Sequence, residues 1–321
     1  MTDWRQNIEQ AYARMYAAPE APYKTGLEYS AYYSTALGCN LYLKQEHLQK
    51  TGSFKYRGAL NKLSSLSAEA IRKGVITASS GNHGMASSLA ANKLGIPITI
   101  HVPEAVSPAK LAGIELYGAT IHKVASDSLA AELSAKKTAE REGLTFVSPY
   151  NDPDIIAGQG TIGLEIIEQL PDVDAVLIAV GGGGLISGIG NYIKAVKPDT
   201  DIIGCWPENS PAMHACIKAG KIYDVPELAT LSDGTAGGVE PGSITFDLCN
   251  QVIDKTVLVS EAEIQATLKE FAGKERQIIE GAAAVALASA KKIAADYQGK
   301  NVAVVLCGRN ISLEKFTELT K

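Results

Sequence analysis

The stretch AVLIAVGGGGL, residues 175–185, decides the fold class of this protein. Its first six residues are apolar, which is typical of a strand buried on both faces of a parallel sheet. The next four residues are the glycines Gly181, Gly182, Gly183 and Gly184, and a helical pattern follows over residues 185–196. Backbone N–H groups can converge at such glycines, and the start of a helix adds partial positive charge. We therefore predict a phosphate-sized anion site here, in preference to a plain tight turn.

Short apolar runs alternate with helical patterns over the rest of the chain. The apolar runs occupy residues 74–77, 98–102, 120–124, 145–148, 201–204, 256–259 and 301–306. The helical patterns occupy residues 83–94, 128–142, 155–169, 261–273 and 281–297. Ser260 followed by Glu263 forms a capping box, which predicts where one helix begins. The alternation predicts an α/β protein with two doubly wound, mostly parallel sheets.

We predict two domains, one of which is discontinuous in sequence. The apolar runs between Lys73 and Pro149 lie close together, and we assign residues 73–149 to a small domain. Residues 1–72 and 150–321 would form a large domain around the glycine stretch. A chain of 321 residues suits two lobes of ordinary size.

Composition and charge argue against several classes of protein. A net charge of −5 makes nucleic acid an improbable partner, because no basic field exists to neutralise phosphates. The N-terminus is polar, and no stretch has the roughly 20 apolar residues of a membrane span. The five cysteines are scattered and form no C-x-x-C pair, which disfavours a disulfide framework or zinc site. We therefore expect a cytoplasmic protein without a membrane partner.

Two further motifs add chemistry to the glycine stretch. The segment SSGNHG, residues 79–84, follows an apolar run and opens a helical pattern, so its N–H groups and hydroxyls could bind a carboxylate. An ordinary helix cap is the alternative interpretation. Lys55 lies between Phe54 and Tyr56 in a turn bounded by serine and glycine. Partial burial would lower its pKa and make it a usable nucleophile, although a lone lysine is usually a solvated charge.

A phosphate site, a carboxylate site and a reactive lysine together are what a pyridoxal-phosphate enzyme acting on an amino acid needs. From about Tyr23 to Asn310 the sequence resembles the fold-type II pyridoxal-phosphate enzymes, and within them the serine/threonine dehydratase and serine racemase group. Four family motifs occur in the family's order: S-F-K-x-R-G-A at 53–59, S-S-G-N-H-G at 79–84, A-G-Q-G-T at 157–161 and the tetraglycine at 181–184.

The resemblance implies a role for each matching residue. Lys55 would form the Schiff base with pyridoxal 5'-phosphate and remove the Cα proton of the substrate. Phe54 would pack near the cofactor, Asn82 would bind its 3-hydroxyl oxygen, and the glycines would hold its phosphate. The substrate carboxylate would be surrounded by Ser79, Ser80, Asn82 and His83. Two further assignments follow: Ser80 can handle a proton on the face opposite the lysine in the racemases, and Asn151 would lie near the cofactor.

The sequence departs from the family pattern at two places. Cys307 stands where the family has a serine facing the pyridine nitrogen, and Arg309 replaces a glycine. A thiol, like a hydroxyl, would leave that nitrogen unprotonated. Trp206 and Ala212 stand at the acidic positions that bind a divalent cation in many relatives, so we predict no metal site. The W-P-E-N-S-P run at 206–211, together with Cys307, resembles hydroxyectoine-utilisation dehydratases.

The resemblance implies a dehydratase, or ammonia-lyase, that converts a small 3-hydroxy amino acid to a 2-keto acid and ammonia. An amino-acid racemase or a β-replacement enzyme of the same fold is the first alternative. A non-catalytic amino-acid-binding protein is the alternative from another class, although the retained lysine argues against it. The family leads us to expect a homodimer, and an end at Lys321 leads us to expect no C-terminal regulatory domain.

Overall fold

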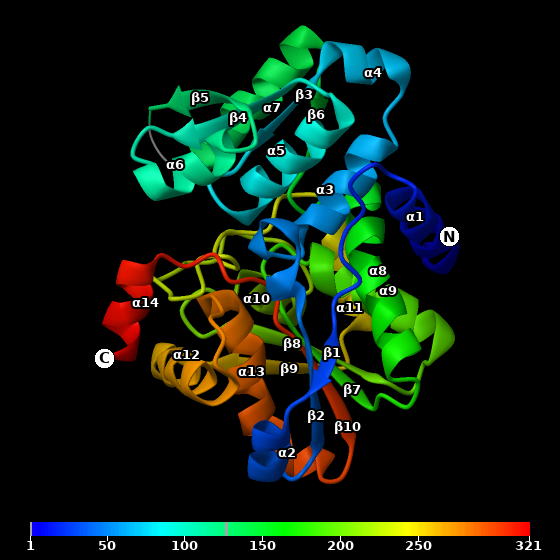
Figure 1. The fold of residues 1–321 in the computed structure, drawn as a ribbon, viewed down its shortest axis with the longest axis vertical. Helices are drawn as coiled ribbons and strands as arrows, with labels where there is room; N and C mark the ends of the chain where they lie inside the picture. Colours follow the sequence, from blue (N-terminus) through cyan, green and yellow to red (C-terminus); the bar gives the residue numbers. More distant parts are fainter. Residues whose placement is uncertain (1, 126–127) are drawn as a thin grey trace.

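Two sheets organise the chain (Figure 1). The computed structural model describes residues 2–125 and 128–321. The larger sheet contains β1 (Leu27–Tyr29), β2 (Asn40–Lys44), β7 (Ala175–Ala179), β8 (Asp201–Pro207), β9 (Lys255–Val259) and β10 (Asn301–Val305), in the order β1-β2-β10-β7-β8-β9. The smaller sheet contains β3 (Val75–Ala78), β4 (Ile98–Pro103), β5 (Thr120–Val124) and β6 (Thr145–Phe146), in the order β5-β4-β3-β6. All pairings are parallel except that of β1 with β2, so the predicted α/β fold with mostly parallel sheets is confirmed.

Helices cover the sheets and connect their strands. Those of the N-terminal half are α1 (Trp4–Tyr16), α2 (Ala31–Leu37), α3 (Lys55–Ser64), α4 (Ala68–Lys73), α5 (Asn82–Leu94), α6 (Pro108–Glu115), α7 (Ser128–Glu142) and α8 (Pro153–Gln169). Those of the C-terminal half are α9 (Gly184–Val196), α10 (Ala212–Ala219), α11 (Ile244–Val252), α12 (Glu261–Glu275), α13 (Gly281–Ile293) and α14 (Leu313–Thr320). Figure 1 shows α8 and α9 on one side of the larger sheet and α12 and α13 on the other. The predicted capping box of Ser260 and Glu263 opens α12.

The larger hydrophobic core lies around β7, whose five residues are all buried. A second core fills the space between the smaller sheet and helices α3 and α5. Helices α3 and α8 approach each other closely. A Cβ atom added at Gly158 would come within 2.7 Å of the Cα atom of Gly58. Backbone contact at this point fixes the position of α3 against the large-sheet core.

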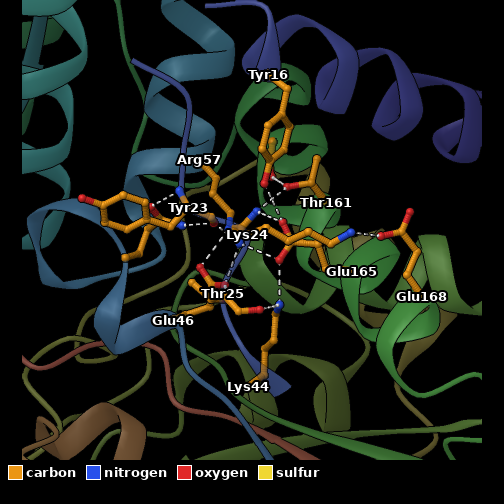
Figure 2. Close-up of polar contacts among 12 residues, drawn as sticks. Tyr16, Tyr23, Lys24, Thr25, Lys44, Glu46, Arg57, Thr161, Glu165 and Glu168 are labelled. Atoms are coloured by element: carbon orange, nitrogen blue, oxygen red, sulfur yellow. Dashed lines mark hydrogen bonds and ion pairs between the residues drawn. The ribbon is translucent and has the colours of Figure 1, made fainter. Parts of the chain in front are cut away.

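A buried charge cluster also anchors α3 (Figure 2). It consists of Lys44, Glu46, Arg57 and Glu165, whose side chains have no exposed surface. The guanidinium of Arg57 donates to both carboxylates, at 2.8 Å to Glu46 Oε1 and 2.6 Å to Glu165 Oε1. Lys44 Nζ donates to Glu165 Oε2 at 2.6 Å and to the carbonyl oxygen of Thr25 at 2.8 Å. The cluster therefore ties together the end of β2, helix α3 and helix α8.

Several elements differ from the sequence-based prediction. The strands β1 and β2 were not predicted, although β2 lies inside the larger sheet next to β10. Lys55, predicted in a turn, is the first residue of α3.

All five cysteines are free and buried. Among the described residues, no helix combines the length and the apolar character that crossing a membrane requires.

Candidate active site

Lys55 contacts the segment that follows β6 of the smaller sheet, and its neighbour Phe54 contacts the segment that follows β10 of the larger sheet. The turn before Lys55 is attached to the end of β10, because Phe54 N donates to the carbonyl oxygen of Cys307 at 3.1 Å. Lys55 Nζ donates to the carbonyl oxygen of Pro149 at 2.8 Å and lies 5.2 Å from the centre of the Phe54 ring. Desolvation lowers the pKa of Lys55 to about 8, although the nearby Cys307 and Glu280 act in the opposite direction. A substantial fraction of this amine is therefore neutral near physiological pH.

The glycine stretch forms a backbone cradle between β7 and α9. Gly183 has a φ of +86°, which a residue with a side chain adopts only with strain, and it precedes α9 without a side-chain cap. Within the described part of the chain, the N–H groups of Gly181, Gly182 and Gly183 have no protein acceptor. Unpaired N–H groups at an uncapped helix start suit an oxyanion, so the cradle fits a phosphate.

Tyr150 connects this cradle to Lys55. Its ring lies against the loop so closely that a Cβ atom at Gly182 would fall 2.5 Å from the ring. The residue before it, Pro149, accepts the hydrogen bond from Lys55. The structure therefore brings the predicted lysine and the predicted phosphate loop together through one short segment.

The SSGNHG segment joins β3 to α5. Helix α5 begins at Asn82, and Gly81 at its N-cap gives it no side-chain cap, so its first N–H groups can bind a carboxylate. Ser79 Oγ accepts a hydrogen bond from Gly81 N at 3.2 Å. Ser80 is half-buried, and its hydroxyl has no hydrogen-bond partner among residues 2–125 and 128–321. Both serines thus directly precede the uncapped start of α5, at the second predicted anion site.

The ring of His83 faces the protein interior. Nε2 lies 3.1 Å from the carbonyl oxygen of Val147, which can only accept, so this nitrogen carries the proton. Burial and the nearby Lys55 lower the pKa of His83 to about 3, so the ring is neutral at physiological pH. A contact from His83 to a carboxylate would therefore come from its backbone N–H at the start of α5.

Asn82 is held by two residues for which the sequence suggested no role. Its Nδ2 donates to Glu280 Oε1 at 2.9 Å, and its Oδ1 accepts from Asn310 Nδ2 at 2.6 Å. Glu280 stands directly before the small-residue helix α13 in an apolar run, and such an isolated carboxylate was a signal of a buried acid. Burial raises the pKa of Glu280 to about 7.

Asn151 and Cys307, both predicted to lie near the cofactor, have different surroundings in the structure. Asn151 Nδ2 donates to Glu240 Oε2 at 2.9 Å, and its Oδ1 accepts from Ile244 N at 3.0 Å, so both ends of the amide have protein partners. Cys307 is buried beside Lys55, and burial raises the pKa of its thiol well above the usual value. The thiol is therefore neutral, which is what a weak partner for a pyridine nitrogen requires.

Arg309, Trp206 and Ala212 are the other departures from the family pattern. Arg309 is exposed, and its backbone N–H donates to the carbonyl oxygen of Gly52 at 2.9 Å. Trp206 is fully buried in β8, and Ala212 begins α10. The side chain of Glu208 is half exposed and lies 3.8 Å from Lys292. Within the described residues, no three acidic, histidine or cysteine side chains are grouped as metal ligands.

Comparison with known proteins agrees with this geometry. The sequence model of the family described as pyridoxal-phosphate dependent enzyme matches residues 19–308. The L-threonine ammonia-lyase of Thermotoga maritima is 43% identical over 91% of this chain and 72% of its own length. The processed threonine deaminase isoform 2 of Solanum lycopersicum has a TM-score of 0.92 at 35% identity, covering 98% of this chain and 93% of its own. Maize serine racemase has the same TM-score of 0.92 at 30% identity, covering 98% and 95%.

The residues present fit pyridoxal phosphate. A partly neutral lysine, an open backbone cradle and a neutral thiol lie together at the carboxyl ends of the strands β7 and β10. The family match spans most of the chain and includes all of these groups. The protein is therefore a member of the fold-type II pyridoxal-phosphate-dependent enzymes, in the serine/threonine dehydratase group.

Proposed function

We propose that this protein is a lyase that removes water and ammonia from a small 3-hydroxy amino acid and releases a 2-keto acid. The observation that carries the proposal is Lys55, whose lowered pKa and position between two anion sites suit a base acting on a bound amino acid. Relatives named for threonine ammonia-lyase and threonine deaminase make threonine the first substrate to test, with serine next.

The residues divide the work of binding and proton transfer. Pyridoxal phosphate, when bound, supplies an electron sink for the bond broken at Cα. Lys55 is the amine that would carry it, and the neutral form of Lys55 would accept the Cα proton. The backbone N–H groups of Gly181 to Gly184 would hold the phosphate, and Cys307 would face the pyridine nitrogen without protonating it.

The first turn of α5 would hold the substrate carboxylate. Ser79, Ser80 and the N–H groups at Asn82 and His83 meet there, and the uncapped helix adds partial positive charge. We assign Phe54 to packing beside the cofactor. Asn151 would act indirectly, because it holds the loop around Glu240 near Tyr150, which in turn covers the glycine cradle.

We also propose that residues 73–149 form the small domain and that residues 1–72 and 150–321 form the large, cofactor-binding domain. The smaller sheet, from Val75 to Phe146, falls within the first range. Homodimer assembly and a cytoplasmic location stay predictions, and light scattering of the purified protein would test the first.

Racemisation is the second candidate. The hydroxyl of Ser80 has no partner among the described residues, so it is available to move a proton, and maize serine racemase shares the fold. A non-catalytic binding protein would have no need of a lysine with a lowered pKa.

Keto-acid release by the cofactor-loaded protein tests the proposal. The substrates would be L- and D-serine, L-threonine, threo-3-hydroxyaspartate, phenylserine and hydroxyectoine. We expect release from L-threonine or L-serine, and release from hydroxyectoine would favour the narrower resemblance. No release from any of them, with inversion of serine detected by chiral chromatography, would replace the lyase with the racemase.

The pH dependence of cofactor uptake tests the state of Lys55. The rate at which cofactor-free protein takes up pyridoxal phosphate should rise with pH and level off above about pH 8, because only the neutral amine attacks an aldehyde. Stopped-flow absorbance measures this rate. A rate that continues to rise to about pH 10, as for an ordinary lysine, would contradict the lowered pKa.

A further inference from the structure

Glu280 is a buried carboxylic acid without a positively charged partner among the described residues. It is 5% exposed, and among the described residues no cation lies within ion-pair distance of it. Glu46 and Glu165, by contrast, both contact Arg57. A buried carboxylate without a counter-charge is costly, so its hydrogen bonds must stabilise it. Those hydrogen bonds come from Asn82 and Asn310.

Glu280, Asn82 and Asn310 form a closed ring of hydrogen bonds. Asn82 Nδ2 lies 2.9 Å and 3.2 Å from the two oxygens of Glu280. Within the ring, Asn310 donates from its backbone N–H to Glu280 Oε2 at 3.0 Å and from its Nδ2 to Asn82 Oδ1 at 2.6 Å. The same Nδ2 also donates to the carbonyl oxygen of Thr51 at 2.8 Å, which fixes the orientation of the Asn310 amide. Asn82 follows β3 of the smaller sheet, whereas Asn310 follows β10, the last strand of the larger one. The ring therefore links the two sheets beside Lys55.

This ring leaves the Asn82 amide only one orientation. An amide can rotate by half a turn about its last bond, which exchanges its donor with its acceptor. An ionised Glu280 can only accept, and Asn310 Nδ2 can only donate. Both neighbours therefore select the orientation in which Nδ2 faces Glu280. One Nδ2 hydrogen satisfies the carboxylate, and the other remains available as a donor.

We propose that Glu280 and Asn310 are positioning residues, which turn the Asn82 amide so that it offers a hydrogen-bond donor to the ring oxygen of the bound cofactor. The inference rests on the proposed function, because the role of Asn82 toward the cofactor belongs to it. An amide turned the other way would place its own oxygen against the cofactor oxygen and repel it.

The electrostatic surroundings make this arrangement depend on pH. Asp233, Cys307 and Lys55 are the titratable groups that face Glu280. Burial and Asp233 raise the pKa of Glu280 to about 7, against the hydrogen bonds from Asn82 and Asn310 and the charge of Lys55. Below this pH the acid gains a proton, and one of its oxygens becomes a donor. Glu280 then no longer selects the amide orientation, which only Asn310 still favours, and cofactor affinity should fall.

Equilibrium dialysis of pyridoxal phosphate against wild type and Glu280→Gln, across the neutral pH range, tests the proposal. The glutamine has the same shape but only one accepting oxygen, so we expect affinity to fall on the order of tenfold at high pH. The part of the pH dependence due to Glu280 should disappear. Glu263→Gln is the matched control, because Glu263 also accepts from a backbone N–H, at 2.7 Å from Ser260 N, but lies in the capping box of α12.

A double-mutant cycle with Asn82→Ala separates positioning from general damage. If Glu280 acts through Asn82, adding Glu280→Gln to Asn82→Ala should lower affinity little further. Independent, additive losses would overturn the proposal, as would wild-type affinity and pH dependence in Glu280→Gln. Should Glu280→Gln fail to fold, as judged by circular dichroism without cofactor, the exposed Asn310→Ala replaces it in the same cycle. Cofactor binding is measured without turnover, so a failed lyase assay would not affect this result.

Discussion

Lys55→Ala is expected to lower keto-acid release by about a thousandfold or more, because the variant loses both the amine that carries the cofactor and the base for the Cα proton. The change removes a half-buried side chain at the first position of α3, and alanine has a high helix propensity. The fold should therefore persist, and circular dichroism of the cofactor-free variant checks this. Activity would be measured at saturating cofactor, and the visible absorption of lysine-bound cofactor after dialysis gives a second readout.

Lys62→Ala is the control from the same helix. Lys62 lies in the last turn of α3 and contacts Asp152 at 2.7 Å and Asp154 at 3.3 Å. Its loss should lower stability somewhat and leave the visible absorption and the turnover in place. If Lys55→Ala retained activity close to that of Lys62→Ala, the proposed base would be the wrong residue.

Arg57→Ala is expected to destabilise the protein more than other single charge removals. The change leaves Glu46 and Glu165 buried without the guanidinium that lies between them, and breaking such a pair costs roughly 3–5 kcal/mol. Alanine also leaves a cavity where a large, fully buried side chain had packed. Urea unfolding of the cofactor-free protein, followed by circular dichroism, measures the free energy of unfolding.

Arg5→Ala provides the exposed counterpart. Arg5 pairs with Glu9 one turn along α1, at 2.9 Å, where both side chains are about half exposed to water. Water screens such a pair, so no measurable change in unfolding is expected. Arg57→Lys keeps the charge but loses the two-sided geometry, and it should lie between alanine and wild type. Equal stability of Arg57→Ala and Arg5→Ala would show that the buried charge cluster contributes nothing.

The elements that the sequence predicted are those whose pattern is local. The run from Ala175 to Val180 is apolar throughout, and it forms the central strand β7. The capping box at Ser260 needs only four consecutive residues and opens α12 as predicted. The family was recognised for the same reason, since each of its motifs is a short, continuous stretch.

Features that depend on distant partners were not predicted. The strand β2 ends in Lys44, and a lysine usually argues against a buried position; here Glu165, far away in sequence, stabilises its charge. Glu280 becomes part of the site only because α13 begins beside Asn82 and Asn310. No pattern within either segment reveals the other, so only the folded chain brings these residues together.

The buried charge cluster also constrains how this protein can drift over evolutionary time. Its four members belong to segments around residues 44–46, 57 and 165, and each neutralises another. Losing any one alone strands an opposite charge in the interior, so the intermediate sequences are poorly folded. Related lineages should therefore keep the four residues as a set or exchange them together for apolar ones. The position of α3, the helix that begins at Lys55, would then depend on a group of residues that can change only together.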